Sequence, residues 1–162
     1  MVSQNSSKDL EGLLVVTVEQ AVAAPYTSCR LADAGARVIK VERPEGDFAR
    51  NYDSNALGNS AYFVWLNRGK ESIALDLKNK EDMVVFENII SKSDILIQNL
   101  APGAFERLGL NLKELRLKYP SLITCTISGF GDNGPYKNQK AYDMLIQAET
   151  GVIDITGLPD KE

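Results

Sequence analysis

The sequence contains no histidine, and this absence removes several kinds of active site. A Ser-His-Asp or Cys-His nucleophile, a histidine-bound zinc ion and an imidazole general base all need a side chain that these 162 residues lack. Any acid-base or nucleophilic chemistry within the chain must therefore come from carboxylate, Lys, Tyr, Cys or Ser side chains.

Cysteines and long apolar segments are also scarce. Cys29 and Cys125 are the two cysteines, and they form no Cys-x-x-Cys pair. This spacing fits a reducing compartment better than a disulfide framework or a zinc site, so we expect two core cysteines and no metal. No apolar run approaches the length of a membrane span, and the amino terminus lacks the basic-then-apolar order of a signal peptide. We expect a cytoplasmic protein with no membrane partner.

The composition is that of an ordinary globular domain. Hydrophobic residues make up 44% of the chain and charged residues 25%, which is enough for roughly one domain with a core. With 18 basic and 22 acidic residues the formal net charge is -4, so no overall basic field attracts nucleic acid. We expect no nucleic-acid partner, a flexible amino terminus over residues 1–9 and a single domain over residues 10–162.

Short apolar runs alternate with segments of helical spacing. In residues 80–93 the apolar side chains Met83, Phe86, Ile89 and Ile90 fall on one helical face. Strands separated by helices indicate an α/β fold with a doubly wound, mainly parallel sheet. The patterns predict strands at 13–18, 37–42, 72–77, 94–99 and 121–128, helices at 25–34, 80–93, 102–110 and 112–119, and a loop at 46–60.

Polar side chains follow several of these strands, where a parallel sheet binds its ligands. Arg43, Lys78, Asn99 and Arg107 each lie just beyond a predicted strand and could meet at one edge. Taken singly, each is better explained as a solvated loop residue, because charged and polar side chains are mostly exposed. Several basic groups at the ligand-binding edge favour an anion site.

The stretch GFGDNG, residues 129–134, matches the G-x-G-x-x-G pattern directly after a predicted strand. A dinucleotide site also requires a helix that begins at the third glycine, but Pro135 and the polar YKNQK follow instead. The first predicted βα junction, VEQAVAAPYT, lacks such glycines too. We therefore reject an NAD site and expect these glycines to shape a turn or to allow a close backbone approach.

Five ordered blocks carry a resemblance to a known family: LADAGARVIKVERPEGD, NRGKESIALDLK, SDILIQNLAPGAFERLGL, YPSLITCTISGFGDNGPY and KAYDMLIQAETG. They resemble the amino-terminal part of the family III (CaiB/BaiF) coenzyme A transferases. This group includes formyl-CoA:oxalate and crotonobetainyl-CoA:carnitine CoA-transferases and the α-methylacyl-CoA racemases. The resemblance runs from about Leu10 to the end of the chain. It implies a Rossmann-like domain that binds CoA, in a family whose two chains interlock as a homodimer.

The resemblance also implies a set of CoA contacts. Arg43 and Arg107 would hold the phosphates, a role that agrees with the suitability of basic side chains for the anionic 3′-phospho-ADP part of CoA. The charges that follow RVIKV are accordingly interpreted as a grip on the phosphates. The other implied contacts are Leu75 and Lys78 at the adenosine, Asn99 and Leu100 at the nucleotide or pantetheine, Val22 and Ala23 at the thioester end, and Lys140 and Tyr142 in the pantetheine channel.

Transferases of this family use an aspartate that attacks the acyl-CoA, giving a mixed anhydride and then an enzyme-CoA thioester. The family pattern places that aspartate beyond Glu162, so we expect an amino-terminal fragment that lacks a second domain and is inactive alone. Asp143, in AYDMLIQA, matches the position of a supporting active-site carboxylate. The alternative is that Asp143 simply caps the helix that it opens.

Three functions are consistent with these observations. The first is a CoA-transferase that moves CoA between an acyl-CoA and a small carboxylic acid, with this chain supplying the CoA-binding part. The second is a racemase-like isomerase, which is disfavoured because racemases of the group place a histidine where this chain has Tyr142. The third is a non-catalytic CoA-binding module.

Overall fold

The computed structural model describes residues 8–157. Most of the predicted flexible terminus lies outside the described residues, but Lys8 belongs to a turn in which the backbone N–H of Glu11 donates to its carbonyl at 3.0 Å. In chain order the elements are β1 (Leu14–Val18), α1 (Ala23–Asp33), β2 (Arg37–Glu42), η1 (Phe48–Asn51), α2 (Ala61–Asn67), β3 (Lys70–Ala74), α3 (Lys80–Ile90), β4 (Ile95–Gln98), α4 (Ala104–Arg107), α5 (Leu112–Lys118), β5 (Ile123–Thr126), α6 (Asp143–Glu149) and α7 (Val152–Ile155).

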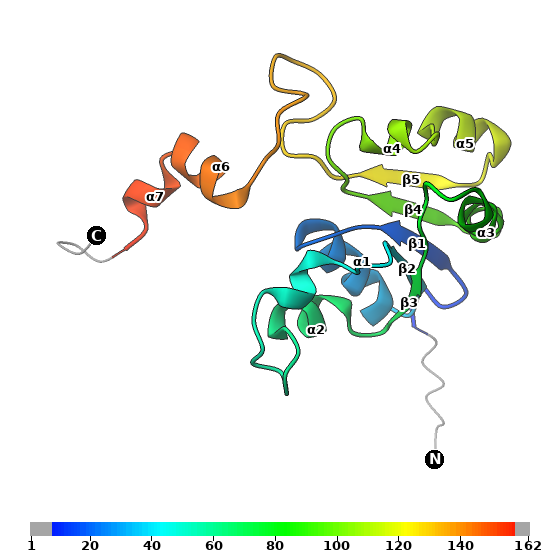
Figure 1. Cartoon of the computed structure of the whole chain (residues 1–162), viewed down its shortest axis with the longest axis horizontal. Helices are drawn as coiled ribbons and strands as arrows, with labels where there is room; N and C mark the ends of the chain where they lie inside the picture. The colour runs from blue at the N-terminus through cyan, green and yellow to red at the C-terminus, as the bar shows by residue number, and fades with distance from the viewer. Residues whose placement is uncertain (1–7, 158–162) are drawn as a thin grey trace.

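The strands form one five-stranded sheet in the order β3-β2-β1-β4-β5, and every neighbouring pair is parallel (Figure 1). The chain starts at the central β1, adds β2 and β3 on one side, and then crosses to β4 and β5 on the other. This order confirms the predicted α/β fold with a parallel sheet. It also creates a switch point between β1 and β4, where parallel sheets bind ligands beyond the carboxyl ends of the strands.

Helices cover both faces of the sheet, because the central strands are apolar on both sides. On one face Val16 and Leu96 pack with Phe86 of α3 and Phe105 of α4, and α5 joins the same cluster through Leu115. On the other face Val15, Val38 and Ile97 pack against α1. The two clusters hold the strand ends in fixed relative positions.

The local sequence explains why α3 begins where it does. The side chain of Asn79 accepts hydrogen bonds from the backbone N–H groups of Glu81 and Asp82, so it serves as the N-cap. Phe86 and Ile90 are buried, whereas Val84 and Val85 are exposed on the opposite side. The apolar face predicted for this segment is therefore confirmed.

Two element predictions are wrong in detail. The predicted strand 72–77 begins earlier and ends earlier, as β3 at Lys70–Ala74. Its partner β2 ends at Glu42, so the ladder stops, although Leu75 and Leu77 remain buried as the alternation suggested. The loop predicted over 46–60 contains the short helix η1, and α2 follows it without having been predicted.

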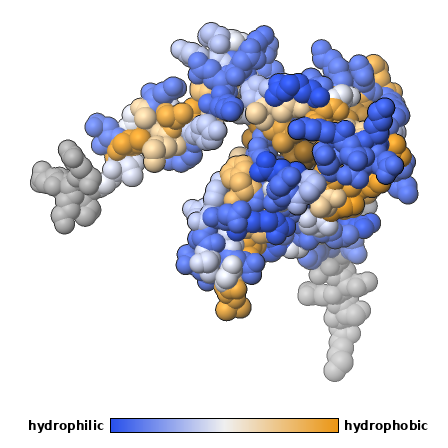
Figure 2. All heavy atoms as spheres, in the orientation of Figure 1, coloured by the Kyte–Doolittle hydropathy of each residue, from blue (hydrophilic) through white to orange (hydrophobic). Residues whose placement is uncertain are grey.

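The carboxyl-terminal part of the chain leaves the sheet after β5 and extends away from it (Figure 1). Helices α6 and α7 pack on each other, and many of their apolar side chains are exposed (Figure 2). Met144 and Ile155 are 74% and 82% exposed. Among residues 8–157, no helix has the length and apolar character needed to cross a membrane.

Candidate functional site

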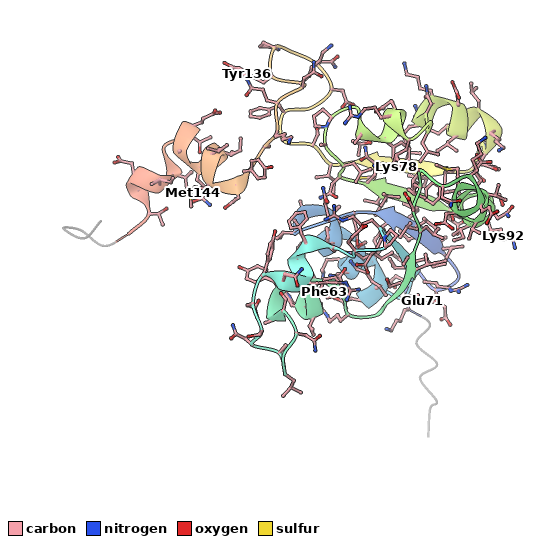
Figure 3. The ribbon with its side chains drawn as sticks, viewed as in Figure 1. Phe63, Glu71, Lys78, Lys92, Tyr136 and Met144 are labelled. Atoms are coloured by element: carbon pink, nitrogen blue, oxygen red, sulfur yellow. The ribbon has the colours of Figure 1, made fainter. Side chains whose placement is uncertain are left out.

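An open cavity of about 810 Å³ lies beyond the carboxyl ends of β1, β2 and β3, at the switch point of the sheet. Its size falls within the range of cofactor and ligand sites in proteins. Lys78 lies at its rim, whereas Tyr136 and Met144 lie on the carboxyl-terminal part of the chain, away from it (Figure 3). The residues that line it are Val18, Glu19, Gln20, Val41, Glu42, Arg43, Pro44, Glu45, Gly46, Asp47, Leu75, Asp76, Leu77, Lys78, Leu100, Ala104, Arg107 and Leu108.

Three of the four predicted polar residues meet at this cavity: Arg43, Lys78 and Arg107. All three are exposed. The Nε–H of Arg43 donates to the carbonyl of Gly46 at 2.9 Å, which closes a turn directly after β2. One guanidinium N–H of Arg107 donates to the carbonyl of Pro102 at 3.3 Å. Neither bond goes to a carboxylate, so both positive charges remain available to an anion.

The acidic residue Asp47 also lines the cavity, but it does not take part in binding an anion. Its side chain is fully buried, and its Oδ2 accepts a hydrogen bond of 2.7 Å from the Nζ of Lys40, which is 1% exposed. The Nζ of Lys40 also donates to Asn67 Oδ1 at 3.0 Å. Burying an ion pair costs free energy unless its polar groups have hydrogen-bond partners, and the Lys40 and Asp47 side chains have such partners.

Glu42 is a second buried acid at the cavity wall. Its carboxylate accepts hydrogen bonds from Arg50 at 2.7 and 2.9 Å, from Ser72 at 2.7 Å and from the backbone of Asp47 at 2.9 Å. Burial alone would raise the pKa of Glu42, but these bonds outweigh it and lower the pKa to about 2. Glu42 therefore carries its charge at every physiological pH, matched by Arg50.

Glu19 is the third buried acid, and it forms an ion pair with the buried Lys70 at 2.7 Å. Ser28 donates to both carboxylate oxygens of Glu19 at 2.8 Å, and Lys70 also donates to Asn67 Oδ1 at 3.1 Å. Burial lowers the pKa of Lys70, and the charge of Glu19 opposes that effect. Asn67 thus links the Lys70 pair to the pair formed by Lys40.

These contacts correct the interpretation of the charges that follow RVIKV. Arg43 faces the cavity as an exposed base, but Glu42 and Asp47 are buried carboxylates neutralised by Arg50 and Lys40. Two of the four charges that follow RVIKV are therefore part of the interior and do not bind phosphate, whereas Arg43 and Glu45 are exposed. Sequence reasoning missed the fixed role of Asp47; the available signal was its position after Gly46, where its side chain caps η1.

Asn99, the fourth predicted polar residue, is not among the residues that line the cavity. Its Oδ1 accepts a hydrogen bond from the backbone N–H of Gln20, and its Nδ2 donates to the carbonyl of Gln20, both at 2.9 Å. Its amide therefore holds the loop between β1 and α1. Gln20 does line the cavity, and sequence analysis did not identify it.

The structure separates the remaining predicted contacts into two groups. Leu75 and Leu100 line the cavity with the basic residues. The others do not line it: Val22 and Ala23 are exposed at the start of α1, and Lys140 and Tyr142 are exposed in the carboxyl-terminal part of the chain.

Asp143 is the first residue of α6, and the N-cap of that helix is Tyr142. Asp143 therefore opens the helix as predicted and lies in its first turn, where the dipole favours an acid, but it is not the N-cap residue. Its carboxylate accepts a hydrogen bond from the side-chain amide of Gln147, one turn later in the helix.

The rejection of GFGDNG as a dinucleotide motif is confirmed by its conformation. No helix begins at Gly134, and α6 starts only at Asp143. Gly131 and Gly134 adopt φ values of 74° and 91°, which are typical of turns. Gly129 lies so close to Ala141 that a side chain there would overlap it.

Within residues 8–157 no group of three or more His, Cys, Asp or Glu side chains is arranged to hold a metal ion.

The arrangement suits a ligand that has both an anionic and an apolar part. The exposed bases follow β2 and β3 or belong to α4, and apolar residues such as Leu75, Leu100 and Leu108 also line the cavity. The exposed acids Glu45 and Asp76 share the rim. The three buried acids are already paired with their own bases, so they do not neutralise the exposed ones.

Comparisons with known proteins agree with this arrangement. Residues 10–162 match the sequence profile of CoA-transferase family III. The chain is 42% identical over 151 residues to the acetyl-CoA:oxalate CoA-transferase of Acetobacter aceti, covering 93% of this chain and 39% of that protein. It is 37% identical over 165 residues to the succinate–glutarate CoA-transferase of Agrobacterium fabrum, covering 96% of this chain and 41% of that protein.

A solved structure shows the same architecture. The crystal structure of a CAIB/BAIF family protein from Brucella suis superimposes with a TM-score of 0.86 at 39% identity, over 96% of this chain and 42% of that one. The chain thus spans about two fifths of the length of the relatives that it matches. With the profile match over residues 10–162, these likenesses show that the chain belongs to CoA-transferase family III.

Proposed function

We propose that this chain supplies the CoA-binding part of a CoA-transferase, an enzyme that moves CoA from an acyl-CoA to a small carboxylic acid. The observation that carries the proposal is the meeting of Arg43, Lys78 and Arg107 around one cavity at the switch point of a parallel sheet. The 3′-phospho-ADP part of CoA bears several negative charges. Arginine forks and a lysine point charge are the donors that bind such groups most effectively.

In the proposed complex the phosphates lie between Arg43 and Arg107, and Lys78 with Leu75 flanks the adenosine. Leu100 contacts the chain of the ligand where it leaves the nucleotide. Val22 and Ala23 face the thioester end, and Asn99 lies with Leu100 near the nucleotide or the pantetheine. Lys140 and Tyr142 reach the pantetheine once the rest of the protein holds α6 in place.

The proposed chemistry is covalent transfer through a carboxylate. An aspartate attacks the thioester carbon of the acyl-CoA, releases the CoA thiolate and forms a mixed anhydride. The thiolate then attacks the aspartyl carbonyl, which frees the acid product and leaves an enzyme-CoA thioester for the second acid. We place that aspartate beyond Glu162 and give Asp143 a supporting role, so the 162-residue chain binds CoA without turnover. The whole protein is proposed to be a homodimer.

The relatives favour transfer over the isomerase alternative. The two named above transfer CoA between acids, with oxalate in one case and succinate and glutarate in the other. Tyr142 stands where the racemases would need a histidine. We therefore propose small dicarboxylic acids as the class of acceptor.

The test is calorimetric titration of CoA into the chain and into Arg43→Ala. Arg116→Ala is the matched control, because Arg116 is an exposed arginine on α5 that does not line the cavity. Loss of a charge-assisted phosphate contact is expected to weaken binding by roughly tenfold or more. The proposal fails if the unaltered chain does not bind CoA, or if Arg43→Ala and Arg116→Ala have equal effects.

A further inference from the structure

The loop between β1 and α1 is held in an unusual shape. Ala21 adopts φ of +63°, the left-handed region that alanine rarely occupies. Among residues 8–157, Leu57 is the only other non-glycine residue with positive φ, and it is fully exposed. Ala21 instead follows Gln20, which lines the cavity. A conformation of this kind persists only where the surroundings impose it, and such sites cluster where ligands bind.

Asn99 imposes the shape from the β4 side. Its amide makes both of its hydrogen bonds to one residue: Oδ1 accepts from the N–H of Gln20 and Nδ2 donates to the carbonyl of Gln20. Because the N–H and the C=O of one residue are both bonded, the two peptide groups that flank Gln20 are held in place. Asn99 is itself anchored, because its backbone N–H donates to the carbonyl of Val18 at the end of β1.

Asp47 holds the loop from the β2 side. Its Oδ1 accepts from the N–H of Ala21 at 3.2 Å and from the N–H of Ala49 at 2.9 Å. Its Oδ2 accepts a hydrogen bond from Lys40 at 2.7 Å, and the side chains of both residues are buried. The carboxylate therefore cannot turn away from Ala21 without leaving a buried charge unpaired.

The loop reaches the cavity through Gln20, an uncharged residue of its lining. The exposed bases of the lining follow β2 and β3 or belong to α4, whereas the loop residues Gln20, Val22 and Ala23 carry no charge, and of these three only Gln20 lines the cavity. A ligand with its phosphates at Arg43 therefore presents its uncharged remainder to the loop. Asp47 follows Arg43 by only four residues in the chain. The carboxylate that holds the loop is therefore close in sequence to the guanidinium that is proposed to bind the phosphates.

We propose that Asn99 and Asp47 are positioning residues that hold the β1–α1 loop in the shape that receives the pantetheine and thioester end of CoA. The inference rests on the proposed function and adds a role to it: neither side chain needs to touch the ligand. Without the clamp, Ala21 relaxes to negative φ and only a minor fraction of molecules retains the binding-competent loop. The apparent affinity falls in proportion to that fraction.

The test compares two ligands, CoA and adenosine 3′,5′-bisphosphate, which keeps the nucleotide phosphates and lacks pantetheine. Calorimetry on Asn99→Ala is expected to show CoA affinity reduced by about tenfold, corresponding to a competent fraction near one tenth, with bisphosphate affinity unchanged. Retained bisphosphate binding also shows that the variant is folded. Asn88→Ala, at an exposed asparagine on α3, is the matched control and should leave both affinities unchanged.

A second substitution separates positioning from general support. Glycine adopts positive φ as readily as negative φ, so Ala21→Gly in the Asn99→Ala background should recover several-fold of the lost CoA affinity. If Asn99→Ala lowers the affinity for both ligands equally, or lowers neither affinity, the inference is overturned while the proposed function stands. If the unaltered chain binds the bisphosphate but not CoA, the loop receives nothing and the inference is overturned. If it binds neither ligand, the proposed function fails and the inference falls with it.

Discussion

Replacement of Lys40 by methionine should be among the most damaging single changes to this chain. Methionine keeps most of the buried aliphatic stem of Lys40 but removes the ammonium group that bonds Asp47 at 2.7 Å and Asn67 at 3.0 Å. The side chains of Lys40 and Asp47 are 1% and 0% exposed, so no water can replace the lost partner. Asp47 would keep its bonds from Ala21 and Ala49 and lose the cation that neutralises it.

The magnitude follows from the cost of a buried unpaired charge. Removal of one partner of a buried ion pair destabilises a protein by roughly 3–5 kcal/mol. Because a domain of this size loses about 2–4 °C in Tm for each kcal/mol, we expect Lys40→Met to lower Tm by about 10 °C. Neutralising both partners, in Lys40→Met with Asp47→Asn, should cost less than the sum of the two single changes.

The matched control lies on the same strand. Arg37 forms an ion pair with Glu71 at 2.7 Å, but these side chains are 61% and 57% exposed, so Arg37→Met should destabilise the chain far less than Lys40→Met. Urea unfolding of the four variants, Lys40→Met, Asp47→Asn, the double variant and Arg37→Met, followed by circular dichroism, measures the differences. If Lys40→Met costs no more than Arg37→Met, or if the double variant is strictly additive, the buried network is not the support described above.

Three further changes test other parts of the structure. Because the pKa of Glu42 is lowered from 4.5 to about 2 in the folded state, its contribution to stability is complete above pH 4.5 and lost as the pH falls toward 2. Glu42→Gln should therefore flatten the dependence of stability on pH in that range, as measured by denaturant unfolding. Phe86→Ala, at a fully buried position, should cost about 3–5 kcal/mol, whereas Val85→Ala on the exposed face of α3 should cost under about 1 kcal/mol by the same assay. Gly46→Ala places a side chain at φ of +79° beside the turn closed by Arg43, so stability should fall by about 1–2 kcal/mol. The same change should weaken CoA binding in calorimetry. An unchanged CoA affinity would refute the role given to that turn.

The fold was largely predictable because its signals are local and repeated. Runs such as LLVVTV and RVIKVE are apolar enough to be buried on both faces, and the segments between them have helical periodicity. Parallel strands bring their carboxyl ends to one edge, so the meeting of Arg43, Lys78 and Arg107 followed from their positions after strands.

The polar interior was not predictable by the same reasoning. No local pattern indicated that Lys40 and Asp47 are buried, because such residues are mostly exposed. The burial of Lys40 depends on Asn67 and Phe63, which α2 brings to it. Helix α2 was missed because it follows a long polar segment and has only seven residues. The role of Asn99 depends on a contact with Gln20 across 79 positions of sequence, which no local pattern reports.

The central claim is that the cavity at the switch point binds CoA. The most direct measurement is a titration of the isotope-labelled chain with CoA, followed by backbone amide shifts in NMR spectra. The account predicts saturable shifts that concentrate in residues 20–23, 43–47, 75–78 and 100–108. Shifts that are absent, or that are confined to α6 and α7, would contradict it.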